Sequence, residues 1–165
     1  MIEVLKGLQD ALVEETRLER ELAAVGARKR DALVALDLPV VDQSTTREQQ
    51  LIGMVGVAAE RRLRRTAETA RLLGVADGEA SVSRIAERAG EPWKTALSAE
   101  AERLRAARRD VQRIHSANRA LTQQSLVSVK QFFRALGGGG EEATYTRRGM
   151  ESRAGAPQVM IDRVV

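Results

Sequence analysis

The residues from Trp93 to Leu136 form the longest stretch of this chain without glycine or proline. Gly90 and Pro92 stand just before it, and four consecutive glycines, residues 137–140, follow it. Good helix formers fill its interior, which predicts one helix of about 40 residues, roughly 60 Å long at 1.5 Å per residue. The rest of the chain has to be organised around this helix.

The apolar residues of this helix follow a heptad pattern. One set of positions holds Leu97, Leu104, Val111, Asn118, Ser125 and Phe132, and the set three residues later holds Ala107, Ile114, Leu121, Ser128 and Ala135. A narrow seam of this kind is typical of helices that lie side by side in a coiled coil or slender bundle. A second apolar row appears on another face near the C-terminal end, at Leu126, Val129, Phe133 and Leu136. One row can face the bundle, and the other has no obvious partner within the chain.

Two more long helices are predicted in the first half of the chain. Apolar residues at three- and four-residue steps predict a helix over 2–37, which ends before Pro39 because the residue preceding a proline disfavours the helical region. Thr45 and Glu48 have the spacing of a capping box, which predicts a connection over 38–45 and a second helix over 46–74. Its predicted buried face consists of Ile52, Val55, Ala59, Leu63, Thr66, Ala70 and Leu73.

A short helix is predicted over 80–89, just before the long one. Asp77-Gly78 favours a turn, and the amphipathic stretch that follows this turn ends at Gly90. After Leu136 the glycines give a flexible tether to a tail. We therefore predict an all-α protein. Residues 1–136 form an elongated antiparallel three-helix bundle or coiled coil with a short extra helix, and residues 137–165 form a flexible C-terminal tail. One closed bundle and an open hairpin with a displaced third helix both fit the pattern.

Composition agrees with a slender helical protein. Among 165 residues, 30% are charged and only 2% are aromatic, which suits narrow seams better than a thick core. The absence of cysteine excludes disulfides and thiol chemistry. No apolar run approaches the roughly 20 residues that span a bilayer, and the first residues lack the layout of a signal peptide, so we expect a cytoplasmic protein that does not insert into membranes.

The sequence argues against an enzyme. The lone histidine, His115, lies beside the seam of the long helix, where a packing role is expected. No spacing of ligands suits a metal ion, and the four glycines lack the lysine and serine or threonine of a phosphate-binding loop. We therefore expect no catalytic residue, no metal, no cofactor and no small-molecule substrate.

In the order of its parts, the chain resembles flagellar export chaperones of the FlgN type: two long helices, a short turn-rich insert, a third long helix, a glycine break and a tail. The most similar stretch is Asn118-x-x-Leu121-x-x-x-Ser125-Leu126-x-x-Val129, followed by the apolar helix end, by Thr144-Tyr145 and by Gly149. The resemblance implies a small cytoplasmic, non-enzymatic chaperone. Such proteins bind the C-terminal amphipathic helix of hook–filament junction proteins, keep these clients soluble and deliver them to the export gate.

The resemblance also implies which residues act. In the family the C-terminal portion binds the client, and by similarity the client-binding residues are Leu126, Val129, Phe132, Phe133, Leu136, Val159 and Ile161. The family's tail tyrosine is associated with docking at an export-gate component, and Tyr145 matches it by position after the glycine break.

Two functions from other classes stay open. The narrow seams also fit a structural coiled-coil adaptor that self-associates. The net charge of +4, the pI near 10.1 and the dense run from Arg61 to Arg65 also fit a basic helical protein that binds nucleic acid.

Overall fold

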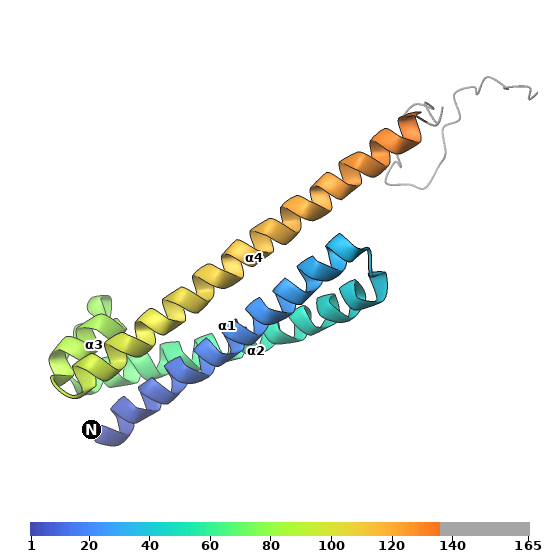
Figure 1. Ribbon diagram of the computed structural model, residues 1–165. Coiled ribbons are helices and arrows are strands. Elements are labelled where there is room, and N and C mark those ends of the chain that lie inside the picture. The colour runs from blue at the N-terminus through green and yellow to red at the C-terminus, as the bar shows by residue number, and fades with distance from the viewer. Residues whose placement is uncertain (136–165) are drawn as a thin grey trace, which may run out of the picture. The chain divides into compact units, whose positions relative to one another are not determined.

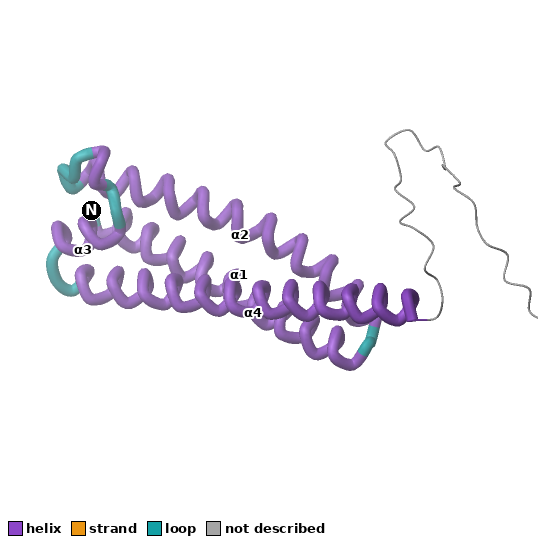
Figure 2. Tube along the Cα trace, turned by 90° about the horizontal axis from the view of Figure 1, so that it is seen from above, coloured by secondary structure: helices purple, strands orange, loops and turns teal. Residues whose placement is uncertain are grey.

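The computed structural model describes residues 1–135, and all regular structure in this part of the chain is helical (Figure 1). Helix α1 spans Ile2–Ala35, α2 spans Leu38–Leu72, α3 spans Val82–Ala89 and α4 spans Trp93–Ala135, with one 3-10 turn, η1, at Asp77–Glu79. The links between these helices are short, and α3 with its flanking turns lies between the C-terminal end of α2 and the start of α4 (Figure 2). The predicted all-α bundle is confirmed.

The chain divides into two compact units, residues 1–122 and 123–165. The first unit contains α1, α2, α3 and α4 as far as Thr122, and the described part of the second is the remainder of α4. The predicted seam of α4 is buried at Leu97, Leu104 and Ile114, and its last buried residue is Asn118. From residue 122 to residue 135 every described side chain is exposed.

Ion pairs and hydrogen bonds give the directions of the helices in the first unit. Along α1, Glu15 pairs with Arg62 and Lys29 pairs with Glu48, so α2 runs antiparallel to α1. In contrast, Glu15 pairs with Arg108, and the Asn118 side chain donates to the carbonyl of Gly26. These two contacts join residues 93 and 92 positions apart, so α4 runs parallel to α1 in a constant register.

The apolar core of the first unit has two parts. The larger part draws on all four helices and consists of Leu5, Leu8, Leu12, Ala70, Ile85, Ala86, Leu97 and Leu104. The smaller part lies between α1 and α2 and consists of Leu18, Leu22, Leu51 and Ala58. Leu8, Leu51, Ile85 and Leu97 have no exposed surface. Each such side chain contributes about 1.5–3 kcal/mol relative to an exposed position. Helix α3, although short, therefore closes the end of the bundle at which the chain begins.

The start of α2 was predicted wrongly. The helix begins at Leu38, and residues 38–45, predicted as a connection, are helical. Pro39 lies in the first turn, where its missing N–H is not needed, and the carboxylate of Asp37 accepts the N–H of Val40 at 3.2 Å as the cap. Thr45 lies inside the helix and donates its hydroxyl to the carbonyl of Val41, so the predicted capping box does not form.

We expect Asp37→Ala to lower the free energy of unfolding by about 1 kcal/mol, because the cap of α2 loses its acceptor. Thr45→Ala is the matched control, and a change within about 0.5 kcal/mol is expected there because Thr45 caps nothing. Urea unfolding followed by circular dichroism measures both. A larger loss at Thr45 than at Asp37 would contradict the observed helix start.

The buried face of α2 is turned by about one residue from the predicted one. Thr66 and Ala70 are buried as predicted, but Ile52 and Leu63 are 54% and 57% exposed. Leu51 and Ala58, each one residue before a position of the predicted face, are buried instead. Apolar residues occur on both flanks of this helix, so periodicity alone does not select the buried one. Met54 and Val57 of the same helix are also exposed.

Candidate functional site

Four of the predicted client-binding residues lie on one side of α4. Leu126, Val129, Phe132 and Phe133 are each at least half exposed. At 100° per residue they occupy an arc of about 120° around the helix. The two phenylalanine rings meet edge to face, with centroids 6.2 Å apart. We call these four residues the α4 apolar face.

Large apolar side chains at adjoining positions of an exposed helix are typical of a surface that binds another protein. Burying each of the four against a partner contributes about 1.5–3 kcal/mol before the costs of association are subtracted. The spacing of Leu126, Val129 and Phe133 is i, i+3 and i+7, which matches the anchor spacing of an amphipathic helix laid alongside. The arrangement can therefore bind an apolar stripe on a partner helix.

Charge around this face is basic. Lys130 and Arg134 are the charged residues in the stretch 123–135. Acidic residues that flank the apolar stripe of a partner would be attracted to them. Val127, which is not among the predicted client-binding residues, is also 52% exposed, but it lies about 100° around the helix from Leu126.

The remaining predicted site residues lie outside the described residues. These are Leu136, Val159 and Ile161, predicted to bind the client, and Tyr145, predicted to dock at the export gate. The structure brings Leu126, Val129, Phe132 and Phe133 together on one exposed face, and the roles of all eight residues stay predictions.

The polar interior of the first unit is built from ion pairs. The carboxylate of Glu15 is fully buried and is bonded by Arg62 at 2.7 Å and by Arg108. Burial raises the pKa of the neighbouring Glu19 carboxyl, and the positive charge of Arg108 opposes this shift. These carboxylates are engaged by arginines that join α1 to α2 and α4, which is a structural role.

The basic run on α2 is not one continuous surface. Arg62 points into the bundle to Glu15, and Arg65 pairs with Glu68 at 2.9 Å. Arg61 and Arg64 have no ion-pair partner among residues 1–135. Half of the arginines expected to contact phosphate or an acidic partner are therefore engaged within the chain, which weakens the nucleic-acid interpretation.

Neither a metal-binding cluster nor a membrane-spanning helix is found in the part of the chain that the structure describes. No group of three or more histidine, aspartate or glutamate residues there is placed to hold a metal ion. None of the helices described is both long enough and apolar enough to cross a bilayer.

Comparison with known proteins gives one match. The family model described as FlgN protein matches residues 1–153. No curated protein matches the chain, and no solved structure does. The matched region includes all four helices, the exposed end of α4 and the position of Tyr145. The chain therefore belongs to the FlgN family, which is a family of flagellar export chaperones and not of enzymes.

Proposed function

We propose that this protein is a cytoplasmic chaperone that binds the C-terminal amphipathic helix of hook–filament junction proteins and keeps them soluble and export-competent. The observation that carries the proposal is the α4 apolar face. Four large apolar side chains are exposed there, on the helix that the family likeness associates with the client.

An isolated amphipathic helix exposes its apolar stripe and tends to self-associate, so a chaperone has to cover that stripe. Leu126, Val129 and Phe133 supply anchors over two turns, and Phe132 widens the contact on one side. Such a surface is large enough to bind but small enough to release, because association costs and side-chain ordering offset much of the gain from burial. Reversible binding is what delivery to an export gate requires.

The proposal extends to residues beyond the described part of the chain. Leu136, Val159 and Ile161 would add apolar contacts to the client, and Tyr145 would dock at an export-gate component. Family resemblance supports these four assignments, whereas both resemblance and exposure support the α4 apolar face.

The test is a binding measurement with the full chain and a peptide covering the C-terminal helix of a co-purified hook–filament junction protein. We expect Leu126→Glu combined with Phe133→Glu to weaken binding by about 100-fold or more, since two central anchors become charged. Isothermal titration calorimetry measures the affinity, and circular dichroism checks that the helix content is unchanged.

Val127→Glu is the matched control, because Val127 is as exposed as Leu126 but lies on another side of the helix. It introduces one glutamate directly beside the face and should leave the affinity within about threefold. Unchanged binding by the double variant, or an equal loss in Val127→Glu, would show that the client binds elsewhere.

A further inference from the structure

The first unit carries an apolar surface that the proposed function does not use. A groove of about 440 Å³ runs between α1 and α2. Ala11 and Leu18 of α1 line it, together with Gly53, Met54, Val57 and Arg61 of α2. We call it the α1–α2 groove. Gly53 contributes no side chain to it, and a Cβ atom added there would meet no other atom within 4 Å.

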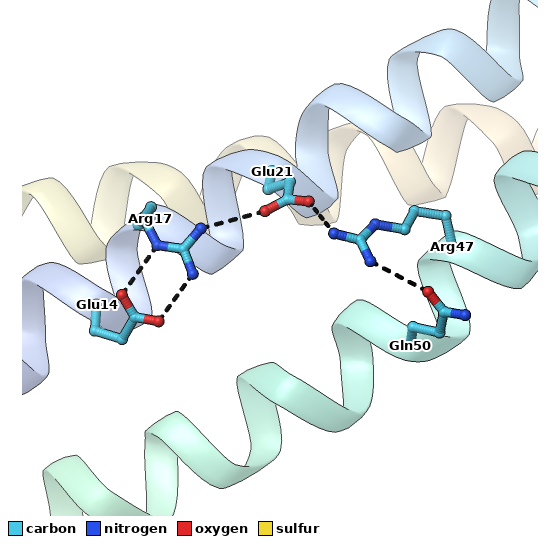
Figure 3. A network of polar contacts seen from close by, with 5 residues as sticks. All are labelled: Glu14, Arg17, Glu21, Arg47 and Gln50. Atoms are coloured by element: carbon cyan, nitrogen blue, oxygen red, sulfur yellow. Dashed lines mark hydrogen bonds and ion pairs between the residues drawn. The ribbon is translucent and has the colours of Figure 1, made fainter.

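Polar contacts cross between the helices at one end of this groove. In Figure 3 a chain of contacts leads from Glu14 through Arg17 and Glu21 on α1 to Arg47 and Gln50 on α2. Glu14 and Gln50, the two ends of this chain of contacts, line the groove. Towards the other end of the helices, the Arg65 side chain lies 3.7 Å from the position of a Cβ atom at Gly7.

The length of the groove suits a helix. Its lining residues on α2 extend from Gln50 to Arg61, which is about 16 Å or three turns. Three turns accommodate apolar anchors at i, i+3 or i+4, and i+7 of an amphipathic helix. Met54 and Val57 are 43% and 66% exposed and present the apolar surface that such anchors would cover.

Charge decides which kind of helix fits. The Glu14 carboxylate is engaged by two hydrogen bonds of 2.9 Å from Arg17, and these bonds hold the pKa of Glu14 below its usual value. Arg61 lines the groove and Arg64 follows it on the same helix, and neither has an ion-pair partner within residues 1–135. The positive charge of Arg61 also lowers the pKa of Glu14, so these two side chains interact. The contacts of Figure 3 together with Arg61 and Arg64 comprise four arginines and two glutamates, so the net charge beside the groove is positive. A second copy of this chain, with its net charge of +4, would bring more positive charge, whereas an acidic partner would neutralise it.

We propose that the α1–α2 groove is a second docking surface, which binds an amphipathic helix that carries acidic residues beside its apolar stripe. Its residues are separate from those of the α4 apolar face. A negative result for this groove would therefore leave the proposed client binding by α4 unaffected, and the reverse also holds.

The test uses a synthetic helical peptide of about 16 residues, with leucines at i, i+3 and i+7 and glutamates beside them. A matched peptide has lysines in place of the glutamates. Both are titrated into the full chain carrying Leu126→Glu and Phe133→Glu, so that the α4 apolar face does not compete. We expect saturable binding of the glutamate peptide, at least about tenfold tighter than that of the lysine peptide.

Two glycines of α2 provide a matched pair of variants. Gly53→Leu places a side chain in the groove, and Gly56→Leu places the same side chain in open space on the same helix outside the groove. We expect Gly53→Leu to lower the affinity for the glutamate peptide by at least about tenfold and Gly56→Leu to leave this affinity unchanged. The Cβ atom at either position meets no other atom within 4 Å, so thermal unfolding should show that both variants fold.

The role of charge is tested by Arg61→Glu. This substitution should lower the affinity for the glutamate peptide and raise the affinity for the lysine peptide. The proposal is overturned if neither peptide saturates, or if Gly53→Leu binds as the parent chain does. It is also overturned if sedimentation shows a dimer that Gly53→Leu dissociates, because the groove would then hold a second copy of the chain.

Discussion

Glu15→Ala should lower the free energy of unfolding by about 3 kcal/mol, which is close to the lower limit for removing one partner of a buried ion pair. Glu15 has no exposed surface, and its two oxygens bind Arg62 of α2 and Arg108 of α4. Without the carboxylate, the Arg62 guanidinium stays mostly buried without its acceptor. Arg108 is 44% exposed and also lies 3.5 Å from Glu19. Solvation by water and the ion pair with Glu19 therefore offset part of the free energy that Arg108 loses with the Glu15 carboxylate.

Glu14→Ala is the control for this prediction. Glu14 is the neighbouring residue, its side chain is 45% exposed, and it pairs with Arg17 on the same helix. Exposed pairs of this kind contribute about 0–1 kcal/mol. Urea unfolding of both variants decides the question: equal losses at Glu14 and Glu15 would mean that the buried carboxylate does not join the three helices.

Gly26→Ala should destabilise the first unit by about 1–3 kcal/mol, although alanine favours a helix over glycine by up to about 1 kcal/mol. The added Cβ atom would lie 2.8 Å from Cγ2 of Ile114 and 3.4 Å from Oε1 of Glu48. Ile114 is branched at Cβ and buried in the seam, so its Cγ2 atom cannot move away without a shift of α4. The Asn118 hydrogen bond to the carbonyl of Gly26, 2.8 Å long, shows how closely the two backbones approach.

Two comparisons test the steric cause. Gly53→Ala adds the same atom in open space and should stabilise the protein by about 0.5–1 kcal/mol. In an Ile114→Ala background the clash is removed, so the cost of Gly26→Ala should shrink by about 1 kcal/mol or more. Thermal unfolding of the four proteins of this cycle measures the coupling. Additive effects of Gly26→Ala and Ile114→Ala would rule out the contact as the cause.

Local signals in the sequence predicted the elements well where they were unambiguous. Gly90 and Pro92 mark the start of the long helix at Trp93, and its heptad selects Leu97, Leu104 and Ile114 as buried. The α4 apolar face could also be predicted, because a second row of apolar residues on one helix is a property of that helix alone. At Pro39 the signal was ambiguous: a proline both ends one helix and suits the first turn of the next, and the second effect decided the start of α2.

The α1–α2 groove could not be predicted in the same way. It depends on which flank of α2 faces α1, and Leu51 and Ile52 are equally suitable for the core by composition. It also depends on which residues of α1 and α2 line the space between the two helices, which is a result of tertiary packing. The signal in the sequence is Gly53, a glycine inside a long helix whose stability it lowers.

The parallel pairing of α1 with α4 has a consequence for the order of folding. The α1–α2 hairpin is closed by a link of very few residues, so its halves meet as soon as residue 72 is available. Docking α4 closes a loop of about 90 residues, which costs more chain entropy and takes place later. During synthesis Glu15 can therefore pair with Arg62 before Arg108 has been made. Leu8 and Leu12 stay exposed to solvent until α3 and α4 pack against them. The newly made hairpin is the species most exposed to aggregation, until the residues that form α4 have been added.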